Sequence, residues 1–113
     1  MFIFVLKEIM KGRSVARAIM HYEIQGVILA GGVVDVGGGR GASYQPKKKK
    51  QEGASVTGFD LKPSHGVTVN IDFEKDTLPR EDGSIDQVLM FNILEHIYHH
   101  QFLVSEVARI LKP

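Results

Sequence analysis

The sequence has 113 residues, of which 43% are hydrophobic and 24% are charged, and these values are typical of one soluble globular domain. It contains no cysteine, which excludes disulfides and thiolate metal sites. The apolar run at residues 1–6 is too short for a signal-peptide core or a membrane span. We therefore expect a soluble, cytoplasmic protein with no membrane partner.

The charge is unevenly distributed along the chain. Residues 1–57 carry nine Lys and Arg against four Asp and Glu, whereas residues 58–113 carry five against nine. Much of the N-terminal excess is the lysine run 47–50, a pattern seen both in nucleic-acid-binding patches and in solvated surface segments. No aromatic residues alternate with these lysines, so a base-stacking platform is not supported and we expect no nucleic-acid partner.

Residues 2–25 have the periodicity of a helix. Val15, Ile19 and Tyr22 recur at i, i+4 and i+7, which predicts a packing face. We expect Gly12 to divide the segment into two helices, with Ser14 capping the second. The N-terminal helical segment is expected to span residues 1–31 and to precede a second unit at residues 32–113.

The periodicity then changes to short apolar runs, which predict strands at 32–36, 56–60, 67–71 and 85–91. A final helix is expected at 98–111, with one apolar face formed by Leu103, Val107, Ile110 and Leu111. Strands that alternate with helices favour a parallel, doubly wound α/β sheet. A crossover helix is expected at 42–52, but this segment has almost no apolar face, so we expect it to be short or frayed.

A glycine-rich segment, Asp35-Val-Gly-Gly-Gly-Arg-Gly41, directly follows the first predicted strand. Glycines here permit turns with positive φ, and the N-terminus of a following helix would offer free N–H groups to a ligand. Gly37, Gly39 and Ala42 also satisfy the dinucleotide-binding pattern. The carboxylate of Asp35 argues against that alternative, because it is poorly placed for a pyrophosphate and suits a cationic ligand with an amino group.

Acidic residues also end the next two predicted strands. Asp60 can accept hydrogen bonds from both hydroxyls of a ribose, or it can cap the turn that follows it. Asp72 and Phe73 offer an acid, a backbone N–H and an aromatic ring to an adenine edge.

In their order and spacing these segments resemble class I S-adenosylmethionine-dependent methyltransferases over roughly residues 32–113. V-V-D-V-G-G-G-R-G at 33–41 resembles the first motif of the family, and G-F-D-L at 58–61 resembles the second. Residues 78–97 are similar to the segment after the third motif in the subfamily that methylates quinones, lipids and other small molecules, and 106–113 resemble the helix before the fifth strand. The resemblance implies a Rossmann-like, three-layer α/β/α fold with a mostly parallel, incomplete sheet in the order 3-2-1-4.

The resemblance also implies a site for S-adenosylmethionine as the cofactor. Its methionine part would lie at the glycine turn and at the end of the fourth strand, near Asp35, Gly37, Gly39, Gly41, Phe91 and Asn92. Its ribose would bind Asp60, and its adenine would contact Leu61, Asp72 and Phe73. Methyl transfer is an in-line displacement at an activated methyl group, so it depends more on positioning than on a dedicated acid or base.

Three histidines follow the fourth predicted strand, and their spacing would allow them to face a common metal from one helix: His96, His99 and His100. The order Glu95-His96 does not match the H-E-x-x-H zinc motif, and the resembled subfamily uses this pair without a metal. We therefore expect no metal site. His96 is the candidate base for an acidic substrate hydroxyl.

The resembled family continues for three further strands, whereas this sequence ends at Lys112-Pro113. The strand at 85–91 would then be an apolar edge, and we expect a homodimer formed around it. The sequence leaves three functions open: a methyltransferase for a small-molecule acceptor, a truncated cofactor-binding module without turnover, and a dinucleotide-binding domain. Asp35 and the segment 78–97 argue against the third.

Overall fold

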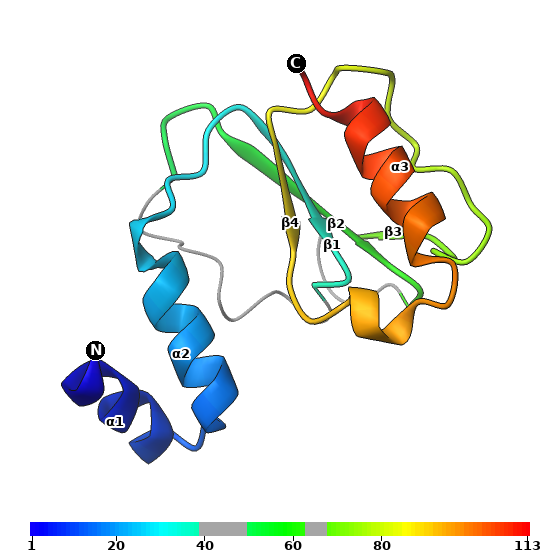
Figure 1. The fold of residues 1–113 in the computed structure, drawn as a ribbon. Helices are drawn as coiled ribbons and strands as arrows, with labels where there is room; N and C mark the ends of the chain where they lie inside the picture. The colour runs from blue at the N-terminus through cyan, green and yellow to red at the C-terminus, as the bar shows by residue number, and fades with distance from the viewer. Residues whose placement is uncertain (39–49, 63–67) are drawn as a thin grey trace.

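The computed structural model describes residues 1–38, 50–62 and 68–113 (Figure 1). The described elements are, in chain order, α1 (Phe2–Met10), α2 (Val15–Glu23), η1 (Ile24–Gly26), β1 (Gly32–Val36), β2 (Ser55–Asp60), β3 (Thr68–Asn70), β4 (Gln87–Met90), η2 (Leu94–His96) and α3 (His100–Ile110). The strands form one sheet in the order β3-β2-β1-β4, with every neighbouring pair parallel. This topology confirms the predicted Rossmann-like arrangement.

The central strand β1 is buried on both faces, which explains its nearly continuous apolar sequence. Because side chains alternate along a strand, Val34 and Val36 point to one face and Val33 points to the other. The first pair packs in the larger apolar core with Phe59 of β2 and with α3, whereas Val33 packs with Leu29 and Leu89 in a smaller cluster.

Helix α3 covers the face of the sheet that carries the larger core (Figure 1). Leu103 and Ile110 are buried, and Val107 and Leu111 pack beside them, so the predicted apolar face of this helix is confirmed. After α3 the chain turns back beside the start of β4, where Leu111 forms a parallel bridge with Ile85.

Several predicted boundaries differ in the structure. The strand expected at 85–91 is shorter and comprises Gln87–Met90, and Asn92 just after it has a positive φ of 54°. Of the crossover helix expected at 42–52, residues 42–49 lie outside the described residues, while Lys50 forms a parallel bridge with Leu29. The boundary between the two predicted units, at 31/32, stays a prediction.

The two N-terminal helices form a hairpin at the end of the molecule remote from α3 (Figure 1). The predicted break and cap are confirmed, because Gly12 has a φ of 81° and the Ser14 hydroxyl accepts a hydrogen bond from the backbone N–H of Arg17 at 3.3 Å. The predicted packing face was wrong for two of its three residues, since Val15 and Ile19 are 56% and 42% exposed. Helix α2 instead buries Ala18, while the ring of Tyr22 meets Phe4 of α1 edge-on, with 5.7 Å between centroids. No helix in the described part of the chain is long and apolar enough to cross a membrane.

The Glu8 side chain connects the two helices of the hairpin through ion pairs. Its side chain is buried, and its carboxylate binds Lys11 at 2.9 Å, Arg13, and His21 of α2 at 2.9 Å. The hydrogen bond from Lys11 and the contacts with His21 and Arg13 outweigh the effect of burial and lower the pKa of Glu8 from 4.5 to about 2.

Candidate functional site

The glycine turn after β1 begins with two residues that leave no room for a side chain. Gly37 has a φ of 73°, and an added Cβ would lie 2.6 Å from the Cδ1 atom of Ile93. At Gly38 an added Cβ would lie 2.2 Å from an oxygen of Asp35. The backbone N–H of Gly37 donates to the carbonyl of Phe59 at 2.8 Å, which fixes the start of the turn to the end of β2.

Asp35, the first predicted site residue, is 1% exposed and lies directly beneath the Gly38 backbone. Its carboxylate therefore lies under the turn, where it can support the turn and attract an ammonium group bound above it. The other two glycines of the predicted set, Gly39 and Gly41, lie outside the described residues.

The four residues predicted to bind adenosine come together at one cavity. It has a volume of about 250 Å³, and its walls are Asp60, Leu61, Asp72, Phe73, Glu74, Ile93, His96 and Ile97. Asp60 ends β2 and the other residues follow β2, β3 and β4, so the cavity lies at the carboxyl ends of parallel strands, where ligands of doubly wound folds bind.

Local hydrogen bonds fix both acids of this cavity. The Asp60 carboxylate accepts from the backbone N–H of Lys62 at 3.2 Å, so it caps the following turn and lines the cavity at the same time. The loop after β3 is closed by Asp72, whose Oδ1 accepts from the N–H of Glu74 at 3.0 Å and whose own N–H donates to Asp76 at 2.9 Å. The closed loop holds the buried ring of Phe73 against the cavity.

The structure does not bring Phe91 and Asn92 to this cavity. Phe91 packs against the smaller apolar cluster around Leu29 and Val33. The side-chain amide of Asn92 donates to the sulfur of Met20 in α2 at 3.7 Å. Their predicted role beside the sulfonium stays a prediction.

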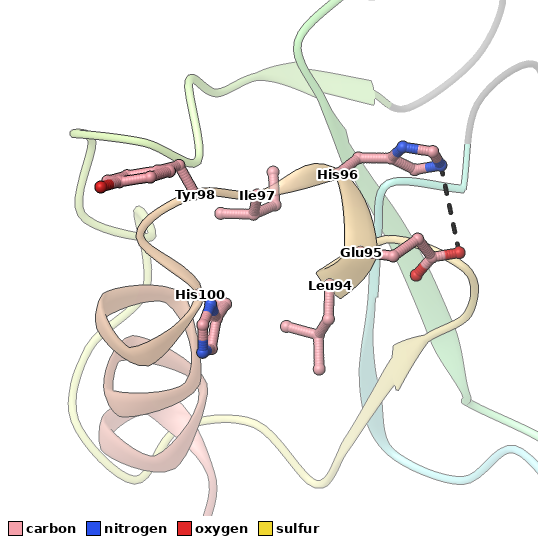
Figure 2. A pocket seen from close by; sticks show the side chains of 6 residues that line it. All are labelled: Leu94, Glu95, His96, Ile97, Tyr98 and His100. Carbon is pink, nitrogen blue, oxygen red and sulfur yellow. Dashed lines mark ion pairs between the residues drawn. The ribbon is translucent and has the colours of Figure 1, made fainter.

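A second, open cavity of about 760 Å³ adjoins the first, and its walls are Leu94, Glu95, His96, Ile97, Tyr98 and His100. His96 and Ile97 line both cavities. Figure 2 shows Leu94 and His100 directed into the space between η2 and α3, whereas Tyr98 points away from it. The same view shows the His96 ring above Glu95, with Nε2 and Oε1 separated by 4.0 Å.

The three histidines considered for metal binding are divided between sites. His96 and His100 line the open cavity, whereas His99 lines a separate hollow beside Phe102 and Lys75. Within the described ranges, no group of three or more His, Cys, Asp or Glu side chains is arranged to hold a metal ion.

Sequence reasoning missed Gly38 in the glycine turn and three residues that line the cavity at Asp60: Glu74, Ile93 and Ile97. Gly38 belongs to the glycine run. The need for a residue without a side chain at this position could have been inferred from Asp35, the acid three residues before it. Nothing in the sequence pattern marks Ile93 or Glu74, because the contact of Ile93 with the glycine turn and the hydrogen bonds of Glu74 with the segment before α3 join parts of the chain that are far apart in sequence.

The sequence matches the methyltransferase domain family over residues 34–113, and the chain belongs to this family. It is 32% identical over 98 residues to the demethylmenaquinone methyltransferase of Tropheryma whipplei, a match that covers 78% of this chain and 40% of that protein. It is 33% identical over 94 residues to the ubiquinone biosynthesis O-methyltransferase of Xanthomonas oryzae pv. oryzae, with 72% and 38% covered. The chain therefore spans about two fifths of the length of these relatives.

Solved structures show the same fold. The methyltransferase solved in complex with the Haloferax volcanii Trm112 methyltransferase activator has a TM-score of 0.65 and 26% identity, and the match covers 85% of this chain and 47% of that one. A SAM-dependent methyltransferase from Aquifex aeolicus has a TM-score of 0.60 and 21% identity, with 81% and 56% covered. Membership of this family argues against the dinucleotide-binding alternative.

Proposed function

We propose that this chain binds S-adenosylmethionine and forms the cofactor-binding part of a methyltransferase for a small-molecule acceptor. One observation carries the proposal: three separate segments, at the end of β2, after β3 and after β4, line a single cavity with the chemistry that a nucleoside requires. That cavity offers two carboxylates for hydroxyl and amino groups, and apolar side chains for a flat ring.

Each part of the cofactor has residues that fit it. The Asp60 carboxylate would accept the ribose hydroxyls, and Leu61 and Phe73 would contact the adenine faces, with Asp72 at its edge. The glycine turn, with Asp35 beneath it, would hold the methionine part through backbone groups at Gly37, Gly39 and Gly41. The bound cofactor supplies a methyl group activated by positive sulfur, and the protein has to position the acceptor in line with it.

The open cavity beside the cofactor cavity is the proposed acceptor site. It shares His96 with the cofactor cavity, so this imidazole lies where a reacting hydroxyl has to approach the cofactor. A neutral His96 could accept the hydroxyl proton, with the Glu95 carboxylate stabilising the resulting imidazolium. The two relatives, a demethylmenaquinone methyltransferase and a ubiquinone biosynthesis O-methyltransferase, support an aromatic small molecule as the acceptor.

We also propose a homodimer that covers the outer edge of β4. Within the described residues, β4 pairs only with β1 along Gln87–Met90, which leaves its other edge able to pair with a second chain. Light scattering after gel filtration at micromolar concentration should give twice the chain mass. A single-chain mass under these conditions would contradict the proposal.

The proposed cofactor site is tested by calorimetric titration of S-adenosylmethionine and of its demethylated product. Asp60→Ala should raise both dissociation constants at least about tenfold, because a charge-assisted hydrogen bond to the ribose is lost. Glu81→Gln, at an exposed acid outside both cavities, is the control and should leave them unchanged. Absence of saturable binding to the folded wild-type chain would contradict the proposal, and binding without methyl transfer to phenolic acceptors would favour the non-catalytic module.

A further inference from the structure

The Glu74 carboxylate connects two of the chain segments that form walls of the proposed cofactor cavity. It follows Asp72 and Phe73, which form the wall after β3. Its two oxygens accept hydrogen bonds from the backbone N–H groups of Tyr98 at 2.8 Å and His99 at 3.0 Å. Tyr98 and His99 directly follow His96 and Ile97, which form another wall of the same cavity.

We propose that Glu74 is a positioning residue that sets the width of the cofactor cavity by fixing the loop after β3 to the segment between η2 and α3. The inference rests on the proposed cofactor site and deepens it. A carboxylate that accepts two backbone N–H groups has one preferred geometry, so the two walls cannot separate without breaking a charge-assisted hydrogen bond.

The surroundings of Glu74 favour its charged form. The N–H groups belong to His99, the N-cap residue of α3, and to Tyr98 just before it, so the carboxylate also lies near the positive end of that helix. Hydrogen bonds from His99 and Tyr98 lower the pKa of Glu74 below 4.5, although the nearby Asp72 carboxylate acts in the opposite direction. The connection between the walls is therefore intact at neutral pH.

Glu74 also separates the cofactor cavity from the hollow formed with Lys75, His99 and Phe102, since it lines both. Loss of its hydrogen bonds would release the Tyr98 and His99 amides and let the His96–Ile97 wall move relative to Phe73. His96 lines the proposed acceptor site as well, so the same hydrogen bonds keep this candidate base in its position relative to the bound cofactor.

The first test is amide hydrogen exchange in the ligand-free chain, which does not depend on cofactor binding. Glu74→Gln retains the shape of the side chain but replaces one acceptor oxygen with an NH₂ group, which cannot accept from either amide. Exchange at residues 96–99 should become about tenfold faster, while the C-terminal half of α3 keeps its protection. Unchanged exchange at 96–99 would overturn the inference.

The second test is the affinity for adenosine and for S-adenosylmethionine. Glu74→Gln should weaken both by about the same factor, on the order of tenfold, because the affected cavity is the one that holds the nucleoside. The control Glu81→Gln should change neither. The ratio of the dissociation constants of Glu74→Gln and wild type should fall toward one as the pH drops well below 4.5, where the wild-type Glu74 carboxylate is also neutral.

The outcomes separate this inference from the proposed function. Wild-type affinity in the Glu74→Gln variant, with loss of affinity in Asp60→Ala, would overturn the role of Glu74 and leave the cofactor site intact. Faster exchange at 96–99 in a chain that binds neither ligand would support the bridge between the walls and contradict the proposed function.

Discussion

Two adjacent glycines in the turn after β1 are required for different physical reasons. Gly37 has a left-handed backbone conformation that residues with a Cβ rarely adopt, and its Cα also faces Ile93 at close range. Gly38 is required by the buried carboxylate of Asp35, which occupies the space of a side chain. The turn, the buried acid and the loop after β4 therefore constrain one another.

Gly38→Ala tests this close approach. The added methyl group would overlap the Asp35 carboxylate, so we expect a loss of about 1–3 kcal/mol in the free energy of unfolding, as for overpacked sites. Urea denaturation measures this loss. Gly26→Ala in η1 is the matched control, because a Cβ there has no neighbour within 4 Å, and it should change stability by no more than about 0.5 kcal/mol.

Glu8 gives the N-terminal hairpin a defined pH dependence. Its pKa in the folded chain is about 2, against 4.5 for an ordinary glutamate, so the folded state favours the charged carboxylate. The stabilisation is fully present above pH 4.5 and is lost as the pH falls toward 2. The difference in unfolding free energy between wild type and Glu8→Gln should therefore be largest at neutral pH and should disappear at low pH.

The control for this titration is Glu23→Gln, at an exposed acid at the end of α2. The unfolding free energy of Glu23→Gln should differ little from that of wild type at neutral pH, where the difference for Glu8→Gln is greatest. A Glu8→Gln gap that stays constant between pH 7 and pH 2 would show that the carboxylate does not hold the hairpin through its charge.

At the scale of elements, a partly buried ion pair between Glu106 and Arg109 anchors α3 to the loop before β4. The Glu106 carboxylate accepts from the backbone N–H of Leu78 at 2.9 Å and from Arg109 at 2.8 and 3.0 Å. Arg109 in turn donates to the carbonyl oxygens of Leu78 and Arg80 and to Asp82. The helix that follows the open cavity is thus fixed at its far end by one network.

Glu106→Gln should weaken this anchor, because Arg109 loses its buried carboxylate partner. The pKa of Glu106 is lowered by the hydrogen bond from Arg109, so the charged pair stabilises the fold at neutral pH. We expect the melting temperature to fall by about 5 °C or more, measured by circular dichroism. Glu81→Gln, at an exposed acid in the same loop, should have the melting temperature of wild type. Equal melting temperatures for the two variants would contradict the proposed anchoring role of Glu106.

At the scale of the whole molecule, the sequence predicted what depends on local patterns. The β-branched runs predicted the strands, the spacing of Leu103, Val107 and Ile110 predicted the covering face of α3, and the motif order implied the strand order. The face of α2 was mispredicted because periodicity shows that a helix has an apolar stripe but not which neighbour it meets.

The same limit applies to the site. Acids at strand ends predicted that Asp60 and Asp72 would lie at one site, and both line the same cavity, since the carboxyl ends of parallel strands meet at one edge. Contacts between segments far apart in the chain, such as those of Glu74 with Tyr98 and His99 before α3, leave no trace in the spacing of residues. Phe91 and Asn92 illustrate the converse, because their motif position predicts a ligand contact while their side chains lie toward the smaller core and α2.

The most direct measurement is a crystal structure of the chain with the demethylated cofactor product bound. We predict that the ribose hydroxyls bind the Asp60 carboxylate, that the adenine lies between Leu61 and Phe73, and that the amino-acid end reaches the turn at Gly37. A ligand bound in the open cavity at Leu94 and His100 instead, or anywhere outside the cavity at Asp60, would contradict the proposed cofactor site.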